Sequence, residues 1–171
     1  MKKYLITFVG LLGFVGSTVA FAASGTAVIK GTAEGSDISG KADFMDTPEG
    51  LKISVDLENV PPGSHGFHIH ENGACGDEGK AAGGHYNPNQ MPHGLTSKDG
   101  VEHVHAGDLG NIMIGEDGSG KLEAVLAGLT LSGGKYEVAG RSLILHEKED
   151  DFGQPTGNAG GRIGCGVIET A

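Results

Sequence analysis

Gly66-Phe67-His68-Ile69-His70 places two histidines in alternation with two apolar residues. On a β-strand successive side chains point to opposite faces, so both imidazoles leave one face while Phe67 and Ile69 leave the other. The apolar pair predicts a face packed into a core. The histidine pair offers a metal ion two nitrogen ligands on a rigid strand, and the rest of the chain must supply the remaining ligands.

Short alternating runs separated by turn signals surround this segment, and helical periodicity is scarce. The clearest run, residues 51–58, sets four aliphatic residues against four polar ones. Similar runs predict strands at residues 26–32, 38–44, 109–114, 121–126, 136–146 and 163–169. Residues 72–108 and 147–161 lack alternation, and loops of that length are usually functional. The sequence therefore predicts an all-β, single-domain antiparallel sandwich or flattened barrel of about eight strands with two long functional loops.

Residues 1–22 have the features of a secretory signal peptide. Met1-Lys2-Lys3 is positively charged, an apolar run follows, and Ala20-Phe21-Ala22 offers a small-x-small cleavage site. The alternative is an uncleaved membrane anchor, since the apolar run is just long enough to span a bilayer. The cleavage site and the glycines in the run favour cleavage, which leaves residues 23–171 as the mature domain with no membrane contact.

The mature domain is strongly acidic. It keeps 10 basic residues against 22 acidic ones, a formal charge of −12. Such a surface repels nucleic acid and anionic membranes, which argues against both as partners. A small anionic substrate would need a local positive region to reach the chain.

Cys75 and Cys165 are the two cysteines of the chain. In the oxidising compartment that a signal peptide implies, such a pair favours one disulfide over free thiols or metal ligands. Closing so long a loop stabilises a fold by roughly 4.5 kcal/mol in the chain-entropy model. The bridge would tie the histidine-rich loop to the last predicted strand.

Seven candidate metal ligands remain once His65 and His103 are set aside: His68, His70, His85, His93, His105, His146 and Asp108. Neutral imidazole binds copper and zinc, and a carboxylate beside histidines is a common addition to a tetrahedral zinc site. Seven such ligands are too many for one ion and suit two adjacent ions. His65 lies on the apolar side of its predicted strand, where we expect it to pack and to form hydrogen bonds.

Five ordered motifs resemble the copper/zinc superoxide dismutase family, from about residue 31 to residue 168. They are Gly66-Phe67-His68-Ile69-His70-Glu71, Gly84-His85-Tyr86-Asn87-Pro88, His105-Ala106-Gly107-Asp108-Leu109-Gly110-Asn111, Leu145-His146-Glu147-Lys148 with Asp150-Asp151, and Gly157-Asn158-Ala159-Gly160-Gly161-Arg162 with Cys165-Gly166-Val167-Ile168. His103 has no matching ligand position. The spacing from His93 to His105 and the short loop from Asp150 to Arg162 are similar to the bacterial, exported branch of the family, which agrees with the signal peptide.

The resemblance implies a Greek-key arrangement of strands around two metal ions that share one histidine, His85. The implied copper ligands are His68, His70, His85 and His146. The implied zinc ligands are His85, His93, His105 and Asp108. Asp150 would join a copper histidine to a zinc histidine through their outer nitrogens. Arg162 would draw in and orient an anion beside copper, and its permanent charge suits that task better than a lysine.

The implied reaction is the dismutation of superoxide to dioxygen and hydrogen peroxide by copper cycling between Cu(II) and Cu(I), as antioxidant defence outside the cytoplasm. A His85 that binds copper in one state and carries a proton in the other would be catalytic, because the reaction consumes protons. Zinc, which has no redox chemistry, would hold His85 in place. The resemblance also implies superoxide as partner, a periplasmic location and, in some members, a homodimer.

Plainer interpretations stay open. Lys80, a candidate for an auxiliary positive charge at the entrance, could be an ordinary solvated lysine. Asp150 could cap a loop, and Arg162 could pair with a nearby acid. For the whole chain, a copper-binding or copper-buffering protein and a metal-free structural sandwich compete with the enzyme. A copper-binding protein would need neither Arg162 nor the zinc ligands, and a metal-free sandwich would leave six spaced histidines unexplained. The sequence therefore favours the enzyme.

Overall fold

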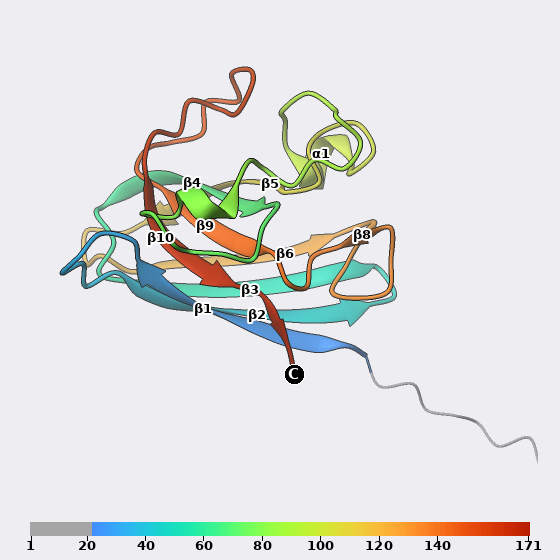
Figure 1. Cartoon of the computed structure of the whole chain (residues 1–171), viewed down its shortest axis with the longest axis horizontal. Helices are drawn as coiled ribbons and strands as arrows, with labels where there is room; N and C mark the ends of the chain where they lie inside the picture. The colour runs from blue at the N-terminus through green and yellow to red at the C-terminus, as the bar shows by residue number, and fades with distance from the viewer. Residues whose placement is uncertain (1–21) are drawn as a thin grey trace, which may run out of the picture.

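The computed structural model describes residues 22–171, and the predicted signal peptide lies outside them except for its last residue. Strands joined by turns and two long loops make up this part of the chain (Figure 1). The strands are β1 (Ser24–Gly31), β2 (Ser39–Thr47), β3 (Gly50–Glu58), β4 (Gly63–His70), β5 (Asp108–Ile114), β6 (Gly120–Leu126), β7 (Leu129–Thr130), β8 (Tyr136–Glu137), β9 (Ser142–His146), β10 (Arg162–Val167) and β11 (Glu169–Thr170). The described helices are the 3₁₀ turn η1 (Lys80–Ala82) and α1 (Thr96–Asp99). Between residues 22 and 171 no helix has the length and apolar character needed to cross a membrane.

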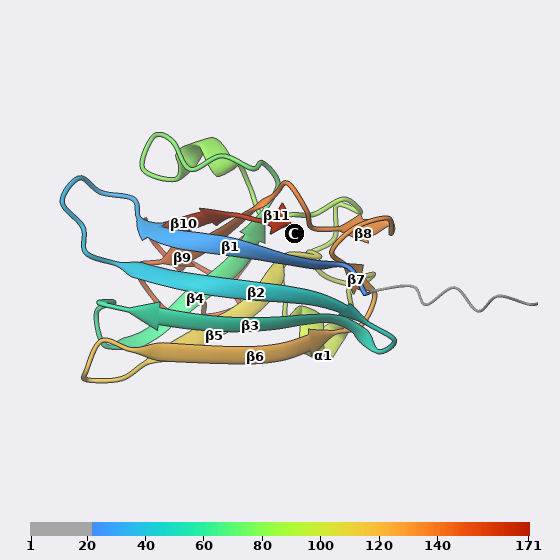
Figure 2. The same ribbon diagram turned by 90° about the horizontal axis from the view of Figure 1, so that it is seen from below.

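The main sheet closes on itself as an antiparallel barrel. Its strands follow the order β10-β9-β4-β5-β6-β3-β2-β1, β1 pairs back to β10, and β11 adds to β1 as an extra strand. β4, β5 and β6 are consecutive neighbours while β3 lies beside β6, which is a Greek-key connection. Figure 2 shows β1, β2, β3 and β6 side by side along one wall. The predicted all-β antiparallel barrel is therefore confirmed.

Alternation along the strands builds the core. In β3, Leu51, Ile53 and Leu57 are almost fully buried while the polar residues between them face outward. Burying one such side chain stabilises the fold by about 1.5–3 kcal/mol. In β4, Phe67 and Ile69 are fully buried in the same core, as their alternation with the histidines predicts.

The predicted strand at residues 136–146 is wrong in part, because a turn divides it into β8 and β9. Gly140 adopts a positive φ of 73°, and Arg141 N–H donates to Val138 O at 3.2 Å. The turn is held against the C-terminal segment, since Gly140 N–H donates to Ile168 O and Ile168 N–H donates to Arg141 O, each at 2.8 Å. The same contacts interrupt the predicted strand at residues 163–169, which becomes β10 and β11.

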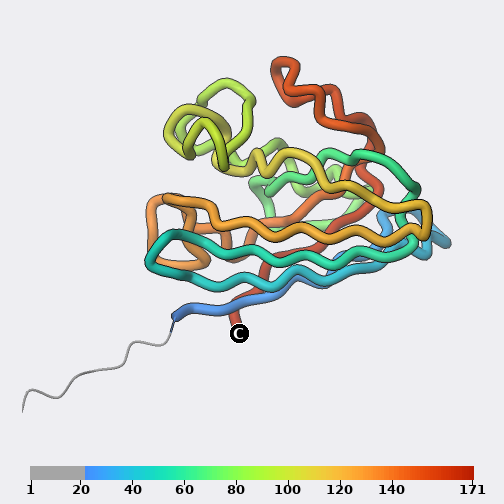
Figure 3. Tube along the Cα trace, turned by 180° about the vertical axis from the view of Figure 1, so that it is seen from behind, coloured from blue at the N-terminus to red at the C-terminus, as the bar shows by residue number. Residues whose placement is uncertain are grey.

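Two long loops, residues 71–107 and 147–161, rise from the same side of the barrel (Figures 1 and 3). They meet where His93 N–H donates to Gln154 Oε1 at 3.0 Å. Cys75 of the first loop is bonded to Cys165 of β10, so the predicted disulfide is confirmed. The barrel wall between the two loops carries β4 and β9, and the predicted ligands gather there.

Candidate metal centre

The segments that carry the loop histidines are fastened to β4 by backbone hydrogen bonds. Tyr86 N–H donates to Ile69 O at 2.8 Å, Ile69 N–H donates to Gly107 O at 2.9 Å, and Gly107 N–H donates to Tyr86 O at 3.0 Å. Position 107 requires glycine, because a Cβ atom there would lie 2.1 Å from Ile69 O. This close approach brings His85, and the residues that flank Gly107, up to the two histidines of β4.

The first cluster contains four histidines, whose ligand nitrogens lie within 4.8 Å of one another: His68, His70, His85 and His146. All four are buried. His68 Nε2 lies 2.8 Å from Asp150 Oδ2, and His70 Nδ1 lies 3.0 Å from Gly83 O. These contacts occupy one nitrogen of each ring and leave the other nitrogen for a metal ion. His70 Nε2 and His146 Nε2 accordingly face each other at 3.4 Å.

The second cluster gathers around a fully buried carboxylate, Asp108. Its ligand atoms also lie within 4.8 Å of one another, and its members are His85, His93, His105 and Asp108. Asp108 Oδ1 lies 2.8 Å from His85 Nδ1 and 3.2 Å from His105 Nδ1. Because Nδ1 of His85 faces this cluster, its Nε2 is the nitrogen available to the first cluster. One imidazole ring therefore belongs to both.

Each cluster contains one buried nitrogen that lacks a hydrogen-bond partner, His68 Nδ1 in the first and His93 Nδ1 in the second. His93 Nδ1 lies 2.8 Å from Asp108 Oδ2 but without hydrogen-bond geometry. Leaving a buried polar atom unpaired costs about 1–3 kcal/mol, so each nitrogen points to a missing partner. Four imidazoles suit copper, and three imidazoles with one carboxylate suit tetrahedral zinc. The residues present thus fit both ions.

Burial keeps the first cluster ready to bind a cation. It lowers the pKa of His70 to about 2 and that of His146 to about 3. It also lowers the pKa of His85 to about 4, although the hydrogen bond to Asp108 opposes this shift. Protons therefore do not compete with a metal ion for these nitrogens near neutral pH.

The second cluster, unlike the first, holds a proton on a histidine in the metal-free protein. Burial lowers the pKa of His93, but contacts with the carboxylates of Asp108 and Asp150 outweigh it and raise the pKa to about 9. Burial likewise opposes ionisation of both carboxylates, yet their histidine neighbours hold the pKa of each below its usual range. A cation is thus favoured at this position, and a metal ion would replace the proton.

Asp150 connects the two clusters from outside. Its Oδ2 lies 2.8 Å from His68 Nε2 and its Oδ1 lies 2.9 Å from His93 Nε2, and the residue is almost fully buried. Asn111 fixes its backbone, because Asp150 N–H donates to Asn111 Oδ1 at 2.7 Å and Asn111 Nδ2 donates to Asp150 O at 2.9 Å. Sequence reasoning missed this role of Asn111, for which the only signal was its place in the third motif.

Arg162 begins β10 at the mouth of the first cluster. Its Nη1 donates to Gly79 O and its Nη2 donates to Gly83 O, both at 2.6 Å. Together with His70 and His146 it lines a cavity of about 200 Å³. The two glycine carbonyls belong to the loop that the disulfide holds, so the disulfide also supports the position of the guanidinium group.

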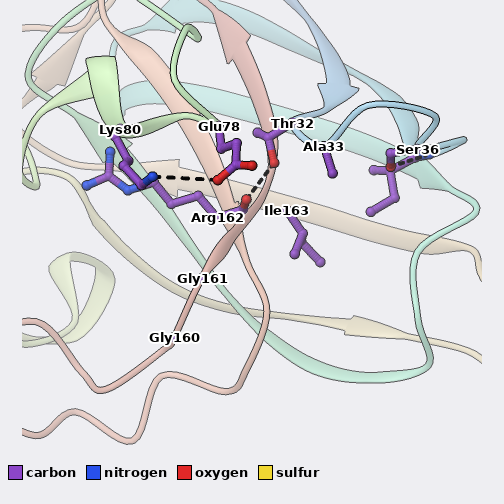
Figure 4. A pocket seen from close by; sticks show the side chains of 10 residues that line it. Thr32, Ala33, Ser36, Glu78, Lys80, Gly160, Gly161, Arg162 and Ile163 are labelled. Carbon is purple, nitrogen blue, oxygen red and sulfur yellow. Dashed lines mark hydrogen bonds and ion pairs between the residues drawn. The ribbon is translucent and has the colours of Figure 1, made fainter.

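Lys80 lies in a larger cavity of about 500 Å³ that also borders Arg162, between the β1–β2 turn and the disulfide-bearing loop (Figure 4). Its side chain is exposed, and Nζ lies 3.5 Å from Glu78 Oε2 and 3.8 Å from Asp77 Oδ1. These acids offset the lysine charge. The guiding role of Lys80 stays a prediction, with weaker geometric support than that of Arg162.

The two histidines set aside in the sequence lie outside both clusters. His65 is buried, with Nδ1 2.8 Å from His146 O and Nε2 2.8 Å from Pro61 O, as its place beside Phe67 predicts. His103 is exposed on the long loop.

Comparison with known proteins agrees with this geometry. Residues 38–168 match the family described as copper/zinc superoxide dismutase (SODC). An extracellular superoxide dismutase [Cu-Zn] of Caenorhabditis elegans is 40% identical over 141 residues, which are 78% of this chain and 62% of that protein. This chain therefore spans less than two thirds of the nematode relative. Superoxide dismutase [Cu-Zn] 1 of Aquifex aeolicus (strain VF5) is 38% identical over 137 residues, 76% of this chain and 79% of that protein.

A solved structure, the crystal structure of the clock protein EA4, covers 91% of this chain and 99% of its own with a TM-score of 0.77 and 32% identity. The family and sequence matches confirm the predicted family, its enzyme class and its copper and zinc cofactors. The chain belongs to the copper/zinc superoxide dismutase family.

Proposed function

We propose that this chain converts superoxide to dioxygen and hydrogen peroxide with a copper ion that cycles between Cu(II) and Cu(I). The proposed copper ligands are His68, His70, His85 and His146. The proposed zinc ligands are His85, His93, His105 and Asp108. The observation that carries the proposal is the position of His85, whose two ring nitrogens belong to two different buried ligand sets.

Copper, when bound, would supply the one-electron chemistry by which one superoxide is oxidised to dioxygen and a second is reduced to peroxide. The chain keeps its ligands deprotonated for this purpose, since burial lowers the pKa of His70 and His146 far below neutral pH. Gly83 O and Gly160 O lie near the outer nitrogens of these rings and orient them.

His85 is proposed as a proton carrier. The overall reaction consumes two protons for each peroxide, and a proton on His85 Nε2 can be delivered to the reduced oxygen species. In the metal-free protein Nδ1 of the same ring lies 2.8 Å from Asp108 Oδ1. With zinc bound, His85 and Asp108 would both be ligands of the ion, which would keep the orientation of the ring when Nε2 gains or loses a proton. The second proton would come from solvent through the cavity at the cluster.

Arg162 is proposed to attract and orient superoxide. Its guanidinium group shares the cavity with His70, His85 and His146 and is fixed by two carbonyl groups. The remaining N–H groups can donate to an anion, and the planar geometry limits how the anion sits. Lys80 is proposed as a minor contributor, because Asp77 and Glu78 lie beside it.

We also propose that the chain acts outside the cytoplasm, in a bacterial periplasm, after removal of residues 1–22. The disulfide and the extracellular function named for the nematode relative support export. The strong negative charge argues against a nucleic-acid partner. The homodimer stays a prediction, which sedimentation equilibrium of the purified protein would test.

The deciding experiment combines metal analysis with superoxide decay. Protein purified from its exported compartment should contain copper and zinc in equal amounts and remove superoxide at a rate proportional to copper content. Tight copper binding without turnover would instead identify a copper-buffering protein and refute the proposed reaction. Loss of the N-terminal segment in the purified protein, read by mass spectrometry, would support export.

A further inference from the structure

A glutamine side chain pairs with the backbone of His93. His93 N–H donates to Gln154 Oε1 at 3.0 Å, and Gln154 Nε2 donates to His93 O at 2.9 Å. The planar amide thus satisfies both backbone polar groups of one residue, as a neighbouring strand would. His93 lies in an irregular part of its loop, where no regular strand or helix fixes the backbone.

The segment that carries Gln154 also contacts the His93 side chain. Asp150 Oδ1 lies 2.9 Å from His93 Nε2, and the Phe152 ring stacks on the imidazole with a centroid distance of 6.4 Å and an interplanar angle of 20°. Phe152 adopts a positive φ of 59°, which is unfavourable for a bulky residue, while its N–H donates to Asp150 Oδ1 at 2.8 Å. Three residues within the segment 150–154 therefore contact the backbone, one face and the outer nitrogen of the same histidine.

These contacts leave the direction of His93 Nδ1 little freedom. A histidine side chain has two rotatable bonds, so a fixed backbone and a fixed outer nitrogen together determine where the other nitrogen points. That nitrogen is buried, has no hydrogen-bond partner and lies 2.8 Å from Asp108 Oδ2 in the second cluster. On the following residue, Gly94 N–H donates to Asp108 Oδ2 at 2.9 Å, which ties the same loop to the cluster.

We propose that Gln154 is a positioning residue for zinc, acting through His93 and leaving the copper ligands unaffected. The proposal rests on the proposed zinc site. Gln154 is itself exposed, and both hydrogen bonds of its side chain go to the backbone of His93, which is not a proposed copper ligand. Removing its amide should therefore weaken zinc binding without unfolding the chain.

The test uses the full-length mature protein with Gln154→Met, which keeps the side-chain length and removes both hydrogen bonds. Gln90→Met is the matched control, because Gln90 is exposed on the same loop as His93 and its side chain has no hydrogen bond to a described residue. Chelator competition should show zinc binding about 10-fold weaker in the first variant and unchanged in the control, with copper affinity equal in all three proteins. Hydrogen exchange of His93 N–H in metal-free protein should be faster only in Gln154→Met.

Equal zinc affinity in Gln154→Met and the parent protein would overturn the proposal. An equal loss of zinc and copper affinity together with a lower melting temperature would also overturn it, because it would indicate a general structural role. Failure of the parent protein to bind zinc would refute the proposed zinc site itself. The zinc titration of the parent protein, made without any variant, separates this outcome from a failure of the role of Gln154.

Discussion

Replacing Asp150 with asparagine isolates the contribution of the carboxylate that joins the clusters. Its two oxygens contact three groups: His68 Nε2 at 2.8 Å, His93 Nε2 at 2.9 Å and Phe152 N–H at 2.8 Å. Asparagine keeps one acceptor oxygen and places an NH₂ donor where the second oxygen was. One imidazole must then move away or carry its proton on the metal-facing nitrogen, where a proton blocks coordination.

The loss should be about 10- to 100-fold in metal affinity, which corresponds to about 1.4–2.8 kcal/mol. Zinc should be affected most, because His93 Nε2 lies within 3.0 Å of both carboxylate oxygens whereas His68 contacts one. Titration with a chromophoric chelator measures each metal separately. Asp151→Asn is the control, since Asp151 is exposed and its oxygens contact Gly153 and Asn158 rather than a histidine. Zinc affinity that is unchanged in Asp150→Asn, or reduced equally in the control, would refute the reasoning.

Three further predictions concern the clusters and their entrance. His146→Ala removes the ligand that β9 contributes to the first cluster, so superoxide turnover should be abolished while zinc stays bound; full residual activity would contradict the copper assignment. Arg162→Ala should lower the rate with superoxide and weaken inhibition by small anions while the copper spectrum is retained, and an unchanged rate would exclude a guiding role. In metal-free protein, the pKa values of His70, His85 and His146 are lower than in the unfolded chain, so the unfolded chain binds protons first and stability falls as pH drops below about 6.5. The pKa of His93 is raised to about 9, so the folded chain keeps a proton that the unfolded chain loses, and stability falls as pH rises from 6.5 to 9. Urea unfolding should therefore show greatest stability near pH 6.5, with a slope of about 1.4 kcal/mol per pH unit for each group that titrates; a maximum above pH 8 would contradict this assignment.

The predictable part of the fold follows from patterns that act within a few residues. Alternation at residues 51–58 predicts a strand because successive side chains of a strand point to opposite faces of the sheet, and β3 includes that range. Alternation at residues 136–146 misled because it continues through a turn. The turn depends on hydrogen bonds between Gly140, Arg141 and Ile168, which are remote in sequence, and no local pattern reports them.

The candidate site likewise contains residues that the sequence predicts and residues that only the structure reveals. The sequence identifies six histidines and Asp108 because such a set, at such spacings, is typical of metal ligands, and the structure brings these seven residues into two clusters. Asn111 and Gln154 escape sequence reasoning because their amides bind the backbone of distant residues, Asp150 and His93. Amide side chains are common on loops, so only the three-dimensional contact distinguishes these two.

The acidic chain and its anionic substrate are compatible because the charges near the cavity matter more than the total. At physiological ionic strength, exposed charges more than about 8 Å apart are largely screened, so most surface carboxylates have little effect at the entrance. Asp108 and Asp150 are buried and bind imidazoles, whereas Arg162 donates to two neutral carbonyl groups and keeps its positive charge. Two bound metal ions would make the field at this cavity more positive still. We therefore expect the net charge, −12 for the mature domain with its 10 basic and 22 acidic residues, to govern solubility and the repulsion of large polyanions. Access of a small anion to the cavity is proposed to depend on Arg162 and the bound metal ions instead.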